Sequence, residues 1–209
     1  IVRVPAVLEA WFSGSEAGNA LADVVFGAVN PSGKLPFTFP VRLEDNGAHA
    51  LGEYPGADKV KYNESIFVGY RWHDKEQLKP LFAFGHGLSY TAFAVGNVKA
   101  DRTTLAPNGS IRISADVTNT GDRAGAEVVQ LYIGDEQSSL PRPVKELKGF
   151  QKVSLNPGQT RTVTFEITPG MLQYYDDAKG AWVAEPGAFT AYVGAASDDI
   201  RGTVEFELK

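Results

Sequence analysis

The sequence has 209 residues, of which 43% are hydrophobic and 22% charged, with a formal net charge of −5. This is the composition of an ordinary globular chain with one large or two small domains, and without a Lys/Arg cluster it argues against a nucleic-acid surface. No apolar run approaches the ~20 residues of a membrane-spanning helix, and the absence of cysteine excludes disulfides and thiolate chemistry.

The first residues do not look like the start of a complete protein. The run Ile1-Val2-Arg3-Val4-Pro5 contains neither an initiator methionine nor the charged and apolar regions of a signal peptide. We therefore expect the chain to be a fragment or a processed product of a longer protein. The compartment stays open, because the lack of cysteine does not separate the cytoplasm from a periplasmic or secreted location.

The N-terminal part predicts a strand, a helix and a second strand. Residues 6–12 form a short apolar run, and Ser13-Gly14-Ser15 supplies capping residues for an amphipathic helix over 17–25. Gly27 suits the C′ position after that helix, and a second strand is expected at 35–39. Such a segment is one unit of an α/β layer, and it cannot cover both faces of a sheet by itself.

The middle of the chain predicts a loop followed by an aromatic segment. Residues 41–60 are polar, and Asn46-Gly47 and Pro55-Gly56 indicate turns. In residues 61–92 aromatic residues alternate with glycines, which a plain linker would not need. We interpret 61–92 as an aromatic strap between two domains. Residues 67–72 within it could form a short strand or a helical turn, and the sequence does not decide.

From residue 93 onward, apolar and polar residues alternate with a period of two. About seven short strands with turns between them, over somewhat more than ~100 residues, are typical of a β-sandwich. The clearest strands are 111–117, 128–133, 163–167, 182–183, 189–193 and 204–208. Pro141-Arg142-Pro143 should lie at an edge or in a loop, because proline cannot donate within a sheet.

Several motifs follow one another in an order that points to one family. They are Ala10-Trp11-Phe12-Ser13-Gly14-Ser15-Glu16-Ala17-Gly18-Asn19-Ala20, Asn30 to Pro40, Tyr62-Asn63-Glu64-Ser65-Ile66-Phe67-Val68-Gly69-Tyr70-Arg71-Trp72, Pro80 to Tyr90, Leu147 to Phe150, and Glu185-Pro186-Gly187. In these motifs the chain resembles the C-terminal part of glycoside hydrolase family 3, the β-glucosidase family. Position 65 departs mildly, since the family usually has glycine where this chain has Ser65.

The resemblance implies an α+β composite fold. Residues 1–60 would be the C-terminal part of an α/β sandwich domain, 61–92 the strap, and 93–209 an all-β fibronectin type III-like sandwich. In relatives the catalytic nucleophile is an aspartate on a preceding (β/α)8 barrel, and the acid/base glutamate lies upstream of Ile1. No residue here matches either motif, so we assign no catalytic residue to this chain.

Three carboxylates would be the candidates if the chain did supply catalytic groups. A retaining glycosidase needs two carboxylates ~5–5.5 Å apart, and Glu53, Glu64 and Asp74 could provide them. We instead interpret Glu64 and Arg71 as structural, because opposite charges among so many aromatics are costly unless they are paired. Arg71 could also bridge carbonyls at the domain junction.

The histidines and serine indicate no other chemistry. His49, His73 and His86 show no metal-ligand spacing, and we expect neither a metal nor a cofactor. His86 stands between two glycines and is expected to pin a turn. Ser89 and His86 could belong to a serine–histidine–acid set, but the Gly-x-Ser-x-Gly elbow is missing.

Two tryptophans and one loop are the remaining candidates for contact with a sugar. Trp11 and Trp72 could stack on sugar rings, although the apolar neighbours of Trp11 favour packing in the core. Residues 41–60 are the best local candidate for a segment that approaches a substrate.

We therefore expect the C-terminal portion of a retaining, exo-acting β-glycosidase, a β-glucosidase acting on terminal β-D-glucosyl residues. The portion alone should be inactive. Its partners would be a companion chain or segment carrying the barrel and the rest of the α/β domain, and a β-glucoside or oligosaccharide substrate, with no nucleic acid and no membrane. The alternative is a stand-alone carbohydrate- or protein-binding β-sandwich. Residues 1–40 discriminate between the two, because a binding module needs no half-built α/β layer.

Overall fold

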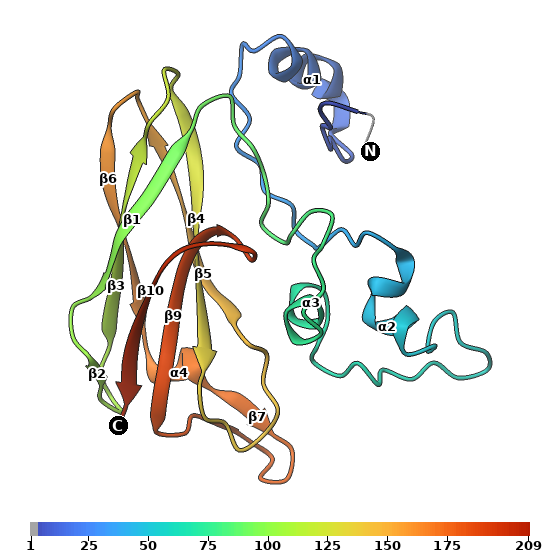
Figure 1. The fold of residues 1–209 in the computed structure, drawn as a ribbon, viewed down its shortest axis with the longest axis vertical. Coiled ribbons are helices and arrows are strands. Elements are labelled where there is room, and N and C mark those ends of the chain that lie inside the picture. The colour runs from blue at the N-terminus through green and yellow to red at the C-terminus, as the bar shows by residue number, and fades with distance from the viewer. Residues whose placement is uncertain (1–3) are drawn as a thin grey trace.

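The computed structural model describes residues 4–209, and its main body is a β-sandwich (Figure 1). One sheet has three strands in the order β1-β3-β6, and the other has five in the order β2-β10-β9-β4-β5. All neighbouring strands are antiparallel except β2 and β10. The strands are β1 (Phe93–Ala100), β2 (Thr104–Leu105), β3 (Ile111–Asn119), β4 (Gly125–Asp135), β5 (Glu146–Leu155), β6 (Thr160–Ile167), β9 (Gly187–Ala196) and β10 (Asp199–Leu208).

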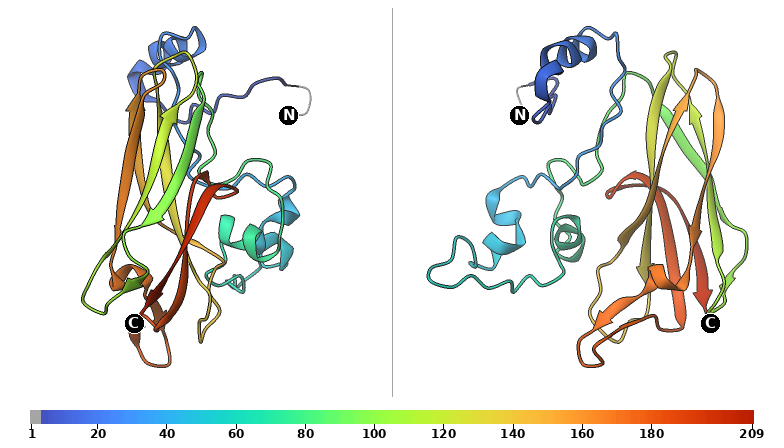
Figure 2. Two further views of the ribbon diagram at one scale, coloured as in Figure 1. Left: turned by 60° about the vertical axis from the view of Figure 1, so that its left-hand side comes forward. Right: turned by 180° about the vertical axis from the view of Figure 1, so that it is seen from behind.

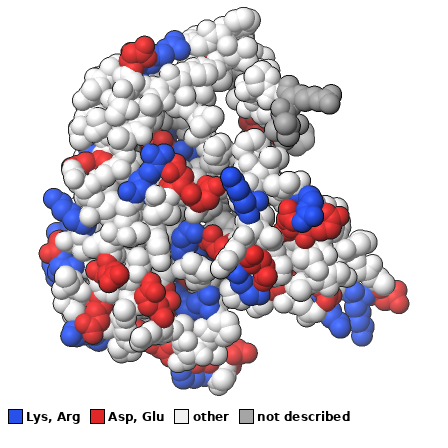
Figure 3. Space-filling model, in the orientation of Figure 1, with Lys and Arg blue, Asp and Glu red and all other residues white. Residues whose placement is uncertain are grey.

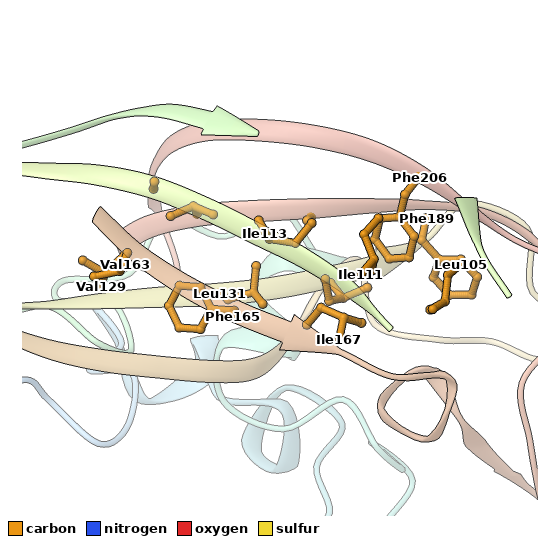
Figure 4. Packing of buried hydrophobic residues seen from close by; sticks show 14 of the residues in the cluster. Leu105, Ile111, Ile113, Val129, Leu131, Val163, Phe165, Ile167, Phe189 and Phe206 are labelled. Atoms are coloured by element: carbon orange, nitrogen blue, oxygen red, sulfur yellow. The ribbon is translucent and has the colours of Figure 1, made fainter. Parts of the chain in front are cut away.

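The alternation in the sequence builds the core between the two sheets. Along β3, every second side chain from Ile111 to Asn119 is buried and the residues between them are more exposed. Side chains from β4, β6, β9 and β10 fill the rest of this core, as Figure 4 shows for Leu131, Phe165 and Phe189. The rings of Phe189 and Phe206 stack with centroids 5.7 Å apart. The predicted sandwich is therefore present.

Some strands were not predicted. β1 has a register shift between Gly96 and Lys99, and Asn97 there has a φ of 52°, so its alternation is broken. β5 carries charged and polar residues on its outer face, so its sequence shows only a weak strand pattern. β7 (Tyr174–Asp176) was also not predicted; after α4 (Pro169–Leu172) it forms a short hairpin with β8 (Ala181–Val183), which contains the strand predicted at 182–183. Pro141-Arg142-Pro143 lies in the loop between β4 and β5, as expected.

The N-terminal segment contains the predicted helix but neither predicted strand. Helix α1 (Ala17–Val25) follows a 3-10 turn at Gly14–Glu16, and Gly27 ends it with a φ of 79°. Ser13 and Ser15 do not cap it; the N-cap residue is Glu16, and Ser13 Oγ donates to the Ala10 carbonyl instead. Residues 6–12 and 35–39 have no ladder of their own, because no neighbouring strand in residues 4–209 pairs with 6–12.

The second predicted strand is replaced by a short pairing with the strap. Phe39 forms an isolated antiparallel bridge with Phe82, and Leu35 exchanges backbone hydrogen bonds with Gly85 and His86. Figure 2 shows the two segments running together beside the sandwich. Residues 1–3 of the predicted α/β unit lie outside the described residues.

Between these paired segments the chain makes a long excursion. It contains a 3-10 turn at Leu43–Asp45, α2 (Gly47–Ala50) and α3 (Tyr70–Lys75). Asn46-Gly47 begins α2 rather than forming the predicted turn, because the Asn46 side chain accepts a hydrogen bond from the Ala48 N–H. The undecided stretch 67–72 therefore ends in a helix. Among residues 4–209, no helix combines the length and apolar character that crossing a bilayer requires.

Candidate functional site

Helix α3 fixes the strap against the sandwich. Gly69 enters the helix with a φ of 61°, a conformation in which glycine has no steric cost. The next residue, Tyr70, stacks on Phe84 with ring centroids 5.0 Å apart and meets Tyr132 of β4 edge-on at 5.7 Å. Its hydroxyl accepts a 2.9 Å hydrogen bond from the Leu147 N–H. One side chain thus joins the strap to both β4 and β5.

A group of ion pairs surrounds this contact. Lys145 Nζ lies 2.6 Å from Asp74 Oδ2, and Arg71 Nη2 lies 3.2 Å from Glu146 Oε1. Arg142 bridges Asp135 and Glu146, at 2.8 Å from each. Burial alone would raise the pKa of Glu146, but the Arg142 hydrogen bond and the neighbouring cations bring that pKa below its ordinary value. The strap and the sandwich are therefore held together by partly buried charges.

A buried glutamine completes the junction. Gln130 Nε2 donates to the carbonyls of Gly85, at 3.1 Å, and Ala195, at 2.7 Å, and Tyr132 Oη donates to Gln130 Oε1. A Cβ on Gly85 would stand 2.2 Å from Gln130 Oε1, so only glycine fits there. Gln130, Lys145 and Glu146 were not predicted from the sequence. The one signal was a glutamine within the apolar run of β4, where a polar residue must find buried partners.

The predicted pairing of Glu64 with Arg71 is wrong. Arg71 pairs with Glu146 of β5, and the structure gives the Glu64 carboxylate no hydrogen bond or ion pair with a described residue. Arg71 therefore spans the domain junction, but it does so through a carboxylate rather than through carbonyls. Glu64 was chosen because it lies in the same aromatic segment as Arg71, whereas the fold brings Glu146 to Arg71 from far along the chain.

The other carboxylate candidates are engaged. Asp74 is held by Lys145, and Glu53 Oε1 accepts a hydrogen bond from Asn63. One groove has a volume of about 550 Å³ and is lined by Asn30 and the adjoining ends of β4, β5 and β6, including Arg161. It contains neither an aromatic ring nor a carboxylate, so it lacks the two acidic groups that glycoside hydrolysis requires.

Each of the three histidines packs against other residues of the chain. His73 is buried with Nδ1 3.2 Å from the Leu78 carbonyl, and His49 meets Tyr54 edge-on at 4.9 Å. His86 stacks on Phe82, and its N–H closes a turn onto Ala83. Within residues 4–209, no three His, Cys, Asp or Glu side chains gather as a metal site.

The structure also places the serine and tryptophan candidates away from any catalytic or sugar-stacking arrangement. Ser89 Oγ donates to Asn30 Oδ1 at 2.8 Å, which ties the strap to the N-terminal segment and leaves no serine–histidine contact. Trp72, in α3 of the strap, is buried against α2 at Gly47, so it offers no stacking face to a sugar. Trp11, expected in the core, is 51% exposed and touches Phe37 edge-on at 5.4 Å.

The N-terminal segment exposes a large apolar face. No residue of α1 is buried, Phe12 is fully exposed, and Phe26 is 87% exposed. In Figure 3 charged side chains of both signs are spread over the sandwich and the excursion, but few lie over α1. A surface of this kind in a globular protein marks an interaction site.

Comparisons with known proteins agree with this arrangement. Residues 2–90 match the family model for the glycosyl hydrolase family 3 C-terminal domain, and residues 127–197 match the fibronectin type III-like domain. The chain is 52% identical to beta-glucosidase BoGH3A of Bacteroides ovatus, across 99% of this chain and 28% of that protein. It is 48% identical to thermostable beta-glucosidase B of Acetivibrio thermocellus, across 96% and 26%.

Solved structures give the same result. The GH3 beta-glucosidase of Bifidobacterium adolescentis superposes with a TM-score of 0.89 at 38% identity, covering 96% of this chain and 29% of that one. The beta-glucosidase of Kluyveromyces marxianus in complex with glucose superposes with a TM-score of 0.86 at 43% identity, covering 95% and 24%. The chain thus spans about a quarter of the length of the relatives it matches. The expected composite fold is confirmed, and the chain belongs to glycoside hydrolase family 3, of which it represents the C-terminal portion.

Proposed function

We propose that the chain is the C-terminal portion of a retaining, exo-acting β-glucosidase that removes terminal β-D-glucosyl residues. The catalytic carboxylates would lie on a companion segment that carries a (β/α)8 barrel and the rest of the α/β domain. The role of this portion is to complete that α/β domain and to support the wall of the active site. Residues 41–60 are the part that would come nearest to the substrate.

One observation carries the proposal: the N-terminal segment is an α/β unit without its neighbours. Residues 6–12 belong to no sheet among residues 4–209, residues 35–39 pair only with the strap, and α1 buries no side chain. Unpaired backbone groups and a bare apolar helix face are both costly in a finished fold. A stand-alone binding module would have no use for such a unit, whereas an enzyme domain completed by further strands requires it.

Reconstitution tests the proposal. The 209-residue chain is mixed with a polypeptide carrying the barrel and the upstream α/β segment, and hydrolysis of an aryl β-glucoside is followed. The lone chain should stay at background and the mixture should be active. Phe26→Asp, on the exposed helix end, should prevent the recovery, whereas Trp182→Ser, a 65% exposed residue of the β7–β8 hairpin, should leave it intact.

Two results would contradict the proposal. Hydrolysis by the lone chain, surviving a check for contaminating enzyme, would return attention to Glu53, Glu64 and Asp74 as catalytic carboxylates. Micromolar binding of cellobiose to the lone chain in calorimetry would favour a binding module instead.

A further inference from the structure

The Glu64 carboxylate lies in the strap without a partner. Its Oε2 is shielded from solvent, and no described residue donates a hydrogen bond to it or forms an ion pair with it. A polar oxygen that is shielded from solvent and has no hydrogen-bond donor is unfavourable. The fold therefore leaves one carboxylate oxygen of Glu64 without the donor that it needs, unless a partner arrives from elsewhere.

The cations of helix α3 do not supply that partner. Arg71 is committed to Glu146 of the sandwich. Lys75 lies over the rings of Phe67 and Trp72, at 4.8 and 5.0 Å from their centroids, and pairs with Glu76 at 3.1 Å. Arg71 and Lys75 are therefore both paired with carboxylates other than Glu64.

The stem of Glu64 is also packed in place. A Cβ built on Gly47 would lie 3.4 Å from Glu64 Cβ and 3.0 Å from the Trp72 ring, so α2 closes tightly over both residues. Buried atoms without partners gather in this region. Five such side-chain atoms occur in the described residues, and three belong to Thr38, Glu64 and Trp72. Among residues 4–209, none of these three polar atoms has a hydrogen-bond partner.

We propose that the Glu64 carboxylate receives a cationic side chain, an arginine or a lysine, from the companion segment. This inference rests on the proposed function, and it names one contact through which the two parts would be assembled. A cation is the stronger donor for this carboxylate than a sugar hydroxyl, because a hydrogen bond between two charged groups is roughly twice as strong as one between neutral groups. In the relatives about three quarters of the length lies outside the matched region, and a residue of that part could provide the cation.

The contact makes Glu64 a positioning residue. It lies within the excursion, between residues 41–60 and α3, and its Cβ packs close to Gly47, the first residue of α2. A cation held there would fix this side of the excursion relative to the segment that carries the catalytic groups. Loss of the contact should therefore weaken assembly without removing a group that acts in the reaction.

Glu64→Gln tests the inference because the expected effect differs between the two states of the protein. In the lone chain the variant should keep or raise the melting temperature, since it replaces a carboxylate that has no partner there. In the assembled enzyme it should raise the dissociation constant of the companion polypeptide by at least about tenfold, which corresponds to about 1.4 kcal/mol of binding free energy. At saturating companion, kcat and KM for the aryl β-glucoside should stay near the wild-type values. Glu44→Gln, at an exposed carboxylate of the same excursion, is the matched control and should change neither.

The contrary outcomes are distinct. A raised KM with unchanged assembly would mean that Glu64 contacts the substrate, and it would overturn the inference. An equal loss of melting temperature in both states would place the partner within this chain, and it would overturn the inference as well. If the wild-type chain itself fails to assemble, the proposed function falls and the inference falls with it. A circular dichroism spectrum matching wild type guards against a misfolded variant.

Discussion

The ion pair between Asp74 and Lys145 allows a direct test of how firmly the strap belongs to the sandwich. Lys145 is the last residue of the β4–β5 loop, its side chain is only 9% exposed, and its Nζ lies 2.6 Å from Asp74 Oδ2 of α3. The Asp74→Ala variant removes the carboxylate and leaves the ammonium buried without its counterion. Breaking one side of a buried pair is far more costly than the pair itself is stabilising.

The expected magnitude follows from the burial of the two partners. Removing one partner of a buried pair costs about 3–5 kcal/mol, and the lower end applies here because the Asp74 side chain is 21% exposed. We therefore expect a loss of about 3 kcal/mol in the free energy of unfolding. For a chain of this size, that loss lowers the melting temperature by roughly 6–12 °C.

Urea denaturation of the 209-residue chain, followed by tryptophan fluorescence, measures the effect. The matched control is Glu76→Ala on the same helix, which breaks an exposed pair with Lys75 at 3.1 Å and should cost less than about 1 kcal/mol. Equal, small losses in the two variants would refute the reasoning. They would mean that α3 detaches before the sandwich unfolds and that the junction lies outside the cooperative unit.

Two further predictions concern the same junction. Gly85→Ala should destabilise the chain by about 2–4 kcal/mol in urea, because the new Cβ displaces Gln130 from buried bonds, whereas Gly158→Ala, with a φ of 72° and open space around it, should cost about 1 kcal/mol. The Glu146 pKa lies below its ordinary value of 4.5, so its stabilising contribution is present above that pH and is lost as the pH falls through the lowered pKa. Glu146→Gln should therefore flatten the acid limb of the unfolding free energy measured against pH, and an unchanged limb would assign it to other carboxylates.

The sandwich was predictable because its signal is local. The alternation of β3, β6 and β9 is legible within each strand, and turns such as Asn156-Pro157-Gly158 separate the strands. The helix over 17–25 could be placed for the same reason. The division at residues 60 and 92 stays a prediction. Contacts of Tyr70 and Asp74 with the sandwich bind part of the strap closely to it.

The features that were mispredicted depend on partners distant in sequence. Residues 6–12 have the composition of a strand, but a strand is defined by the neighbour that it pairs with, and no described segment forms a sheet with them. Arg71 was paired with Glu64 of the same aromatic segment, although its partner in the fold is Glu146 of β5, 75 residues further along the chain. No pattern within a short window of sequence contains that information.

The bridge between Phe39 and Phe82 closes the base of the excursion that they enclose. A loop tied at its base can change length cheaply, because doubling the length of a flexible closed loop costs only about 0.6 kcal/mol in entropy. Insertions near Pro55, where the chain is exposed, would leave the bridge and α3 in register. Evolution and protein engineers can therefore reshape this tip, or graft a segment onto it, while the base and the sandwich stay as they are.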